Sequence, residues 1–97
     1  MRSTGRRLAQ PLIAEFLDER LRALTDRQRR YMVAVASLPP GERTSGAVAG
    51  RLGEPVERWA STQQALVDRH GLLERPARGR VEMAIPQLHR HLSTGDA

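Results

Sequence analysis

The 97-residue sequence predicts a mainly helical fold with one small β-hairpin. A short helix of small residues occupies residues 45–52 and ends at Gly53, and a longer helix opens at Pro55 and stops at Gly71. Two apolar residues, an arginine-rich turn and an alternating run over residues 81–85 then have the pattern of a hairpin. Four helices, two strands and a short last helix in this order predict a winged helix-turn-helix.

One domain accounts for nearly the whole chain. A chain of this length buries one modest core, and 39% hydrophobic residues with one Trp, one Tyr and one Phe indicate aliphatic packing. We expect a flexible basic N-terminus over residues 1–10, the winged-helix domain over residues 11–93 and a disordered tail over residues 94–97.

The first two helices are predicted from apolar spacing and capping signals. Pro11 is a favourable first helical residue, and apolar side chains recur behind it at helical spacing. Thr25 and Gln28 have the spacing of a capping box, which starts a second helix running to about Leu38. Residues 31–36 are all apolar, so this helix should be enclosed on most sides.

Helical periodicity divides the fourth helix into two faces. The residues predicted to face inward are Val56, Trp59, Ala60, Gln63, Leu66, Val67 and His70. Those predicted to face outward are Glu57, Arg58, Ser61, Thr62, Ala65, Asp68 and Arg69. Thr44 or Ser45 caps the preceding helix, the strand after the fourth helix begins at Leu72, and residues 75–80 form the wing. Pro86 opens the short last helix.

The charge balance favours polyanionic partners without proving one. Sixteen basic and eleven acidic residues give a formal net charge of +5, and a solvated surface explains this excess equally well. Every basic residue is arginine, which suits bidentate phosphate contacts. The absence of cysteine excludes disulfides and Cys-ligated zinc. No apolar run approaches the roughly 18 residues of a membrane span or forms a signal-peptide core, so we expect no membrane contact and a cytoplasmic protein.

The outer face of the fourth helix has the composition of a DNA-recognition surface. Its candidate contacts are Arg58, Ser61, Thr62, Gln64 and Arg69. Arg58 has the donors for guanine O6 and N7, and the hydroxyls and the amide suit base edges or phosphates. Glu57 and Asp68 would repel nearby phosphates and favour an ordinary solvated face. Base-specific reading, backbone contact and no contact are the three alternatives.

The wing is a stronger candidate for phosphate contact. Arg75, Arg78 and Arg80 cluster at a hairpin tip that cannot serve the core. The alternative is that a hairpin tip must be polar and arginine is the only basic residue this chain uses. Arg43 and Arg51 flank the third helix and are further candidates for holding phosphates.

The remaining reactive side chains indicate no enzyme. His89 and His91 would project about 200° apart on a helix and cannot chelate one metal, so they and His70 are expected to be structural or surface residues. Trp59 is assigned to the core. No carboxylate has a nearby histidine or serine arrangement for acid–base chemistry, and no phosphate-cradling G-x-x-x-x-G-K-S/T loop is present. We therefore expect no catalytic residues, no cofactor and no metal.

Several stretches of the chain are similar to a known family. They are residues 31–36, residues 45–53, residues 79–86 and Leu88. These resemble the C-terminal winged-helix domain of bacterial AAA-type ATPases related to archaeal-type and replication-initiator ATPases. Residues 16–30 resemble the linker helix that leads into that domain, and the likeness covers residues 12–92.

This resemblance implies a DNA-binding or inter-domain module that normally follows a nucleotide-binding domain. The chain would then be a fragment, a truncated product or a free-standing relative. It departs from the family at Gln64 and Asp68, where basic residues are usual late in the recognition helix.

Two functions follow. In the first, residues 55–70 lie in the major groove of double-stranded DNA and the wing, residues 75–80, holds phosphates. In the second, the same winged helix docks on an ATPase domain or a partner protein. Fold alone does not decide between them. Dimerisation through the first helix is a further option, but packing inside the domain explains its apolar stripe equally well.

Overall fold

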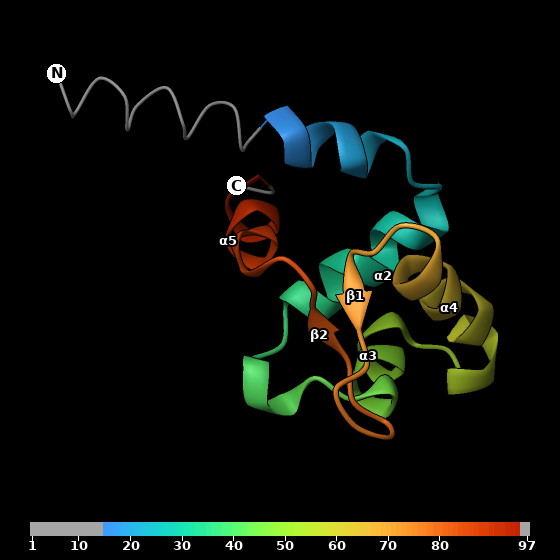
Figure 1. Ribbon diagram of the computed structural model, residues 1–97. Coiled ribbons are helices and arrows are strands. Elements are labelled where there is room, and N and C mark those ends of the chain that lie inside the picture. The colour runs from blue at the N-terminus through green and yellow to red at the C-terminus, as the bar shows by residue number, and fades with distance from the viewer. Residues whose placement is uncertain (1–14, 96–97) are drawn as a thin grey trace, which may run out of the picture.

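A computed structural model describes residues 15–95 and gives a mainly helical fold with one small hairpin, which confirms the predicted fold class (Figure 1). The described part of the first helix spans residues 15–22. The later elements are α2 (Asp26–Ala36), the 3-10 turn η1 (Pro40–Glu42), α3 (Ser45–Leu52), the 3-10 turn η2 (Val56–Trp59), α4 (Ala60–Asp68), β1 (Leu73–Glu74), β2 (Glu82–Met83) and α5 (Pro86–Gly95). The predicted N-terminal segment, residues 1–10, and the helix start at Pro11 lie outside the described residues. α5 extends to Gly95, two residues into the predicted tail.

α2 begins at the predicted capping box. The Thr25 hydroxyl accepts from the Gln28 amide at 3.1 Å, and the Gln28 side chain accepts from the Thr25 amide at 3.0 Å. The helix ends at Ala36, earlier than the predicted end near Leu38, because Pro39 disfavours helical backbone at the residue before it. Leu38 is nevertheless buried.

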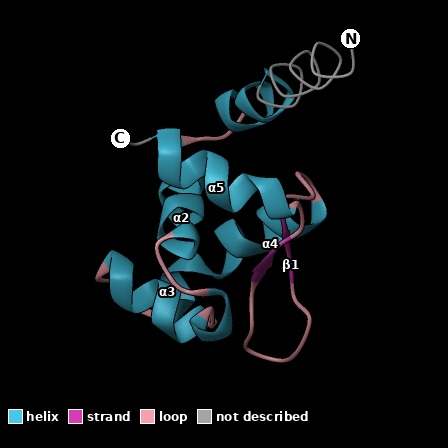
Figure 2. Cartoon of the chain, turned by 90° about the vertical axis from the view of Figure 1, so that its left-hand side faces the viewer, coloured by secondary structure: helices cyan, strands magenta, loops and turns pink. Residues whose placement is uncertain are grey.

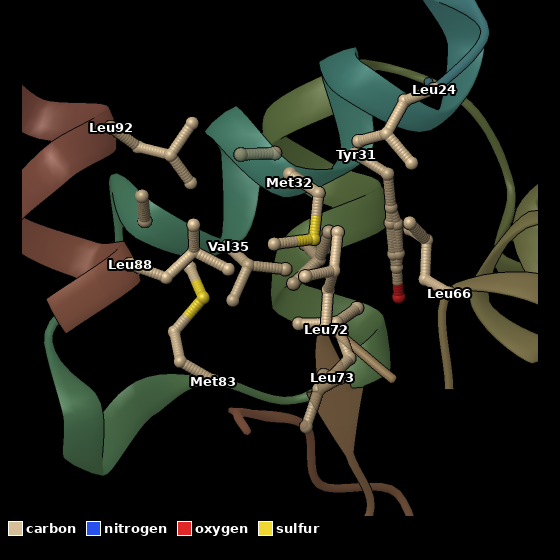
Figure 3. Packing of buried hydrophobic residues seen from close by; sticks show 14 of the residues in the cluster. Leu24, Tyr31, Met32, Val35, Leu66, Leu72, Leu73, Met83, Leu88 and Leu92 are labelled. Carbon is tan, nitrogen blue, oxygen red and sulfur yellow. The ribbon is translucent and has the colours of Figure 1, made fainter. Parts of the chain in front are cut away.

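α2 is the central helix of the domain, and α3, α4 and α5 pack around it (Figure 1). Every apolar residue from Tyr31 to Ala36 is buried except the half-buried Val33. Figure 3 shows Val35 between Leu88 of α5 and the hairpin residues, with Tyr31 beside Leu66 of α4. The core around α2 therefore positions the hairpin and α4 against one another.

The fourth predicted helix is split into two parts. Residues 56–59 form η2, and the α-helix starts only at Ala60. The tighter turn ends on Trp59, which is 2% exposed and packs edge-on against Tyr31 with ring centroids 5.8 Å apart.

The hairpin forms where the alternation over residues 81–85 predicted it, with Ile85 half-buried at its end. β1 and β2 pair antiparallel with Leu73 opposite Met83, and Val81 and Met83 are buried. Gly79 adopts a φ of +77° in the turn, the left-handed region that glycine tolerates. Figure 2 shows the loop between the strands standing out beside the helices.

A third short segment extends the hairpin, which the sequence did not predict. Thr44 forms a bridge with Arg80, the Val81 amide donates to the Arg43 carbonyl at 3.0 Å, and the Ser45 amide donates to the Gly79 carbonyl at 2.9 Å. The start of α3 is thereby attached to the base of the wing. Thr44 is also the helix cap, since its hydroxyl accepts from the Ala47 amide.

The first helix buries Leu17 and Leu21 against the core, while Phe16 is 47% exposed beneath the guanidinium of Arg20. The earlier part of its predicted apolar stripe lies outside the described residues. Within residues 15–95, no helix combines the length and hydropathy needed to cross a bilayer.

Candidate nucleic-acid interface

Four of the five candidate residues of the fourth helix are exposed. They are Arg58 in η2, Ser61 and Gln64 in α4, and Arg69 at its C-terminal cap. Glu57 and Asp68 are exposed on the same stretch, so the surface carries both signs of charge. The predicted outward face therefore exists, although it is not uniformly positive.

The prediction that Thr62 faces outward is wrong. The Thr62 side chain is only 7% exposed, so it cannot reach a base edge or a phosphate. At about 100° per residue Thr62 lies about 60° from Trp59 and about 40° from Leu66, so it shares their buried face, and the predicted boundary between the two faces was drawn on the wrong side of it. Val56 is 41% exposed and Ala60 is exposed, although both were predicted to face inward; Ala60 lies about 100° from Trp59, at the edge of the buried face.

The wing presents its arginines unequally. Arg75 and Arg78 are exposed, whereas Arg80 is half-buried at the base of the hairpin. The Arg80 guanidinium lies 3.4 Å from the Pro40 carbonyl and 3.5 Å from the Gly41 carbonyl, at the long limit of hydrogen bonding. Arg78 is therefore the wing arginine best placed to meet a phosphate without giving up an internal contact.

A chain of side-chain hydrogen bonds joins the wing to α4. The Arg75 guanidinium donates to the Gln64 side-chain oxygen at 2.7 Å, and the Gln64 amide nitrogen donates to the Asp68 carboxylate. The first wing residue and the exposed face of α4 thus form one continuous surface. Each end of the Gln64 amide has one partner and keeps one further position, a second N–H and a second lone pair, with which it can contact a base edge.

The prediction that Arg43 holds a phosphate is also wrong. Arg43 is 2% exposed and cannot hold a phosphate. Its Nε donates to the Val35 and Leu38 carbonyls, both at 2.9 Å, and its Nη1 pairs with the Glu82 carboxylate at 2.8 Å. Its Nη2 lies 2.6 Å from His89 Nδ1. Arginine can only donate, so Nδ1 accepts and the imidazole proton sits on Nε2. Arg43 ties the end of α2, β2 and α5 together.

Arg51 is exposed at the end of α3. It lines a groove with Arg29 and Arg30 of α2, and no wing residue lines that groove. The structure therefore does not bring Arg51 to the surface formed by α4 and the wing.

The histidines and Trp59 agree with their expected structural roles where they are described. His89 contacts Arg43, His70 is half-buried after α4, and the side chain of His91 lies outside the described residues. Trp59 is in the core, and its indole Nε1 finds no hydrogen-bond partner among the described residues. In the same part of the chain, no three His, Cys, Asp or Glu side chains are grouped so that they could hold a metal ion.

Arg27 is a structural residue that the sequence did not single out. Its guanidinium lies 3.7 Å from the Trp59 ring centroid and donates to the Arg58 carbonyl at 2.6 Å. It also pairs with Glu54 at 3.4 Å. These contacts hold η2 against the first turn of α2. The sequence could not indicate them, because they form only when η2 folds back over α2.

A buried polar group fixes the orientation of α4. The Gln63 amide nitrogen donates to the Tyr31 hydroxyl at 2.7 Å and to the Ser45 hydroxyl at 2.9 Å. Three helices therefore meet at one amide.

Burial raises the pKa of Tyr31 above its ordinary value of 10.0, and the Gln63 hydrogen bond and the positive charge of Arg75 oppose that shift.

We expect the stability of the domain to fall in alkaline solution because of Tyr31. Its folded-state pKa is raised, so the unfolded chain loses the phenolic proton first, and this contribution to stability is complete below about pH 10 and lost as pH rises through the folded pKa. The chain has one tyrosine, no cysteine and no lysine, so no other side chain titrates in this window. Urea unfolding between pH 8.5 and 11.5, followed by Trp59 fluorescence, measures the slope, and Tyr31→Phe should abolish it. An equal slope in Tyr31→Phe would contradict this assignment.

A family model described as "Domain of unknown function (DUF8462)" matches residues 14–92. No curated protein matches the chain significantly, and no solved structure does either.

Proposed function

We propose that this chain, which belongs to the DUF8462 family, is a DNA-binding winged-helix module. One observation carries the proposal: four exposed arginines occur on two elements that are joined to each other. Arg58 and Arg69 come from the η2–α4 stretch and Arg75 and Arg78 from the wing, and the Arg75–Gln64 hydrogen bond links the two elements. A helix beside a cationic hairpin is the arrangement with which winged helices contact a duplex.

In this proposal the stretch from residue 55 to residue 70 enters the major groove and the wing lies along the adjacent backbone. Arg58, near the N-terminal end of the stretch, is the candidate for a guanine edge, with Ser61 beside it. Arg75 and Arg78 hold phosphates. Glu57 and Asp68 reduce the attraction to the backbone, so we expect binding of modest affinity in which phosphate contacts outweigh base reading.

The setting of this activity is part of the proposal. A cytoplasmic location gives access to DNA, and the resemblance to the C-terminal domain of AAA-type ATPases supports a role beside a nucleotide-binding domain. The module itself is proposed to bind and not to catalyse.

A salt titration tests the proposal directly. If binding neutralises about four phosphates, log K should fall with log salt concentration at a slope of about −3.6. Affinity for a random-sequence duplex of about 20 base pairs should then drop about 150-fold between 50 and 200 mM salt. Fluorescence anisotropy with a labelled duplex measures both quantities.

The same titration can refute the proposal. No measurable binding at 50 mM salt, or a slope near zero, would mean that this surface does not bind DNA. Docking on a protein would then be the better account of the winged helix.

A further inference from the structure

A second basic surface lies between α2 and α3. A groove of about 490 Å³ there has three arginines on its walls, Arg29, Arg30 and Arg51, and no acidic residue among the residues that line it. Its apolar part is formed by Val33 and Ala34 of α2 and Leu52 of α3. This combination differs from the surface of α4 and the wing, where the arginines stand beside other polar side chains.

The arginines of this groove keep donors available. Arg51 is exposed and makes no hydrogen bond or ion pair within the part of the chain that the structure describes. Arg29 gives one donor to the Leu21 carbonyl at 3.0 Å, and Arg30 lies 5.6 Å from the Trp59 ring centroid. Each guanidinium carries five N–H donors, so all three can still bind carboxylates.

The apolar residues of the groove are only partly used by the core. Val33 and Leu52 are half-buried and pack against the core cluster from its edge. Part of their apolar surface therefore faces the groove. Apolar side chains of a ligand or a partner protein are buried most completely in such a concave site, which makes their transfer from water most favourable there.

We propose that this groove binds an acidic amphipathic segment of a partner protein. Apolar side chains of the segment fill the space over Val33 and Leu52, and carboxylates on both sides of that stripe pair with the three arginines. The apolar lining favours a peptide over a DNA backbone, because phosphates and sugars offer little to pack there. This interaction is separate from the proposed DNA binding, since none of the residues that line the groove belongs to α4 or the wing.

A designed peptide is a suitable probe. It has 14 residues, with leucine at positions i, i+3, i+7 and i+10 and mainly glutamate elsewhere, and it carries a fluorescent label. We expect saturable binding to the full chain at 150 mM salt. The Arg51→Glu variant should weaken this binding about tenfold, because it replaces an attraction with a repulsion at an exposed site. Arg22→Glu, an equal charge change on the exposed side of the first helix, is the matched control and should leave it nearly unchanged.

Two further measurements separate the proposal from general charge attraction. A peptide in which serine replaces every leucine should bind at least about tenfold more weakly, since the apolar groups are what the groove adds. Amide shifts in an NMR titration should cluster on residues 29–37 and 51–52. Equal binding by the serine peptide, equal effects of the two charge reversals, or shifts centred on α4 and the wing would each overturn the proposal. Displacement of the peptide by duplex DNA from the same residues would assign the groove to nucleic acid instead.

Discussion

Replacing Arg43 with methionine is expected to destabilise the domain by about 3–5 kcal/mol. The variant removes the buried member of an ion pair whose Glu82 side chain is 25% exposed, and it leaves the Glu82 carboxylate beside the space that the guanidinium filled. It also removes the guanidinium donor from the Leu38 carbonyl, from the Val35 carbonyl, which keeps the Leu38 amide as a donor at 3.1 Å, and from His89 Nδ1. For a domain of this size the loss corresponds to a fall in melting temperature of roughly 15 °C or more. Thermal unfolding followed by circular dichroism measures it.

Arg51→Met is the matched control for this prediction. It removes the same side chain from an exposed position at the other end of α3, and stability should change by no more than about 0.5 kcal/mol. If Arg43→Met leaves too little folded protein to measure, the double variant Arg43→Met/Glu82→Gln should recover part of the stability, because no unpaired carboxylate remains. An Arg43→Met melting curve that overlays the wild type would show that the network contributes nothing.

Arg43 and Arg51 also show where sequence reasoning reaches its limit. Both arginines flank the third helix, and the sequence offered the same interpretation for each. The structure buries Arg43 through partners 39 and 46 positions away in the chain and leaves Arg51 exposed. Local periodicity carries no information on such distant partners, so the burial of a loop arginine could not be predicted.

Local signals, in contrast, predicted the elements well. The Thr25–Gln28 capping box depends on atoms three residues apart, and Gly53 and Gly71 have the positive φ values expected after a helix. The alternation over residues 81–85 likewise placed Val81 and Met83 in the core. Each of these patterns is completed within a few residues, so neighbours in sequence suffice to specify it.

The error at Thr62 has a different origin. At about 100° per residue, Thr62 lies within about 60° of Trp59 and about 40° of Leu66, so it belongs to the buried face of the helix. The predicted boundary between the two faces was placed on the wrong side of Thr62. The four exposed candidates lie roughly 80–160° from Trp59, so their orientation did not depend on that boundary.

The double variant Arg58→Ala/Arg78→Ala is expected to produce the largest loss of DNA binding among simple substitutions. It removes one arginine from the η2–α4 stretch and one from the wing, and neither side chain supplies a contact on which the core depends. The slope of log K against log salt should flatten by about 0.9, to about −2.7, because Arg78 holds a phosphate whereas Arg58 faces a base edge. The loss of affinity should be greatest at low salt, where the phosphate contacts contribute most. Anisotropy titrations at four salt concentrations measure the slope for each variant.

The single variants then distinguish backbone contact from base reading at this surface. Arg78→Ala should weaken binding to all sequences equally, whereas Arg58→Ala should cost about 1–3 kcal/mol more on duplexes that contain its preferred guanine, if that residue reads a base.

Glu57→Gln should act in the opposite direction and raise affinity about twofold to fivefold, because it removes a carboxylate that faces the same backbone. Arg22→Ala, on the first helix, controls for the change in net charge. If Arg22→Ala flattens the slope as much as Arg78→Ala does, the attraction comes from the overall charge of +5 and no particular face of this winged helix is responsible.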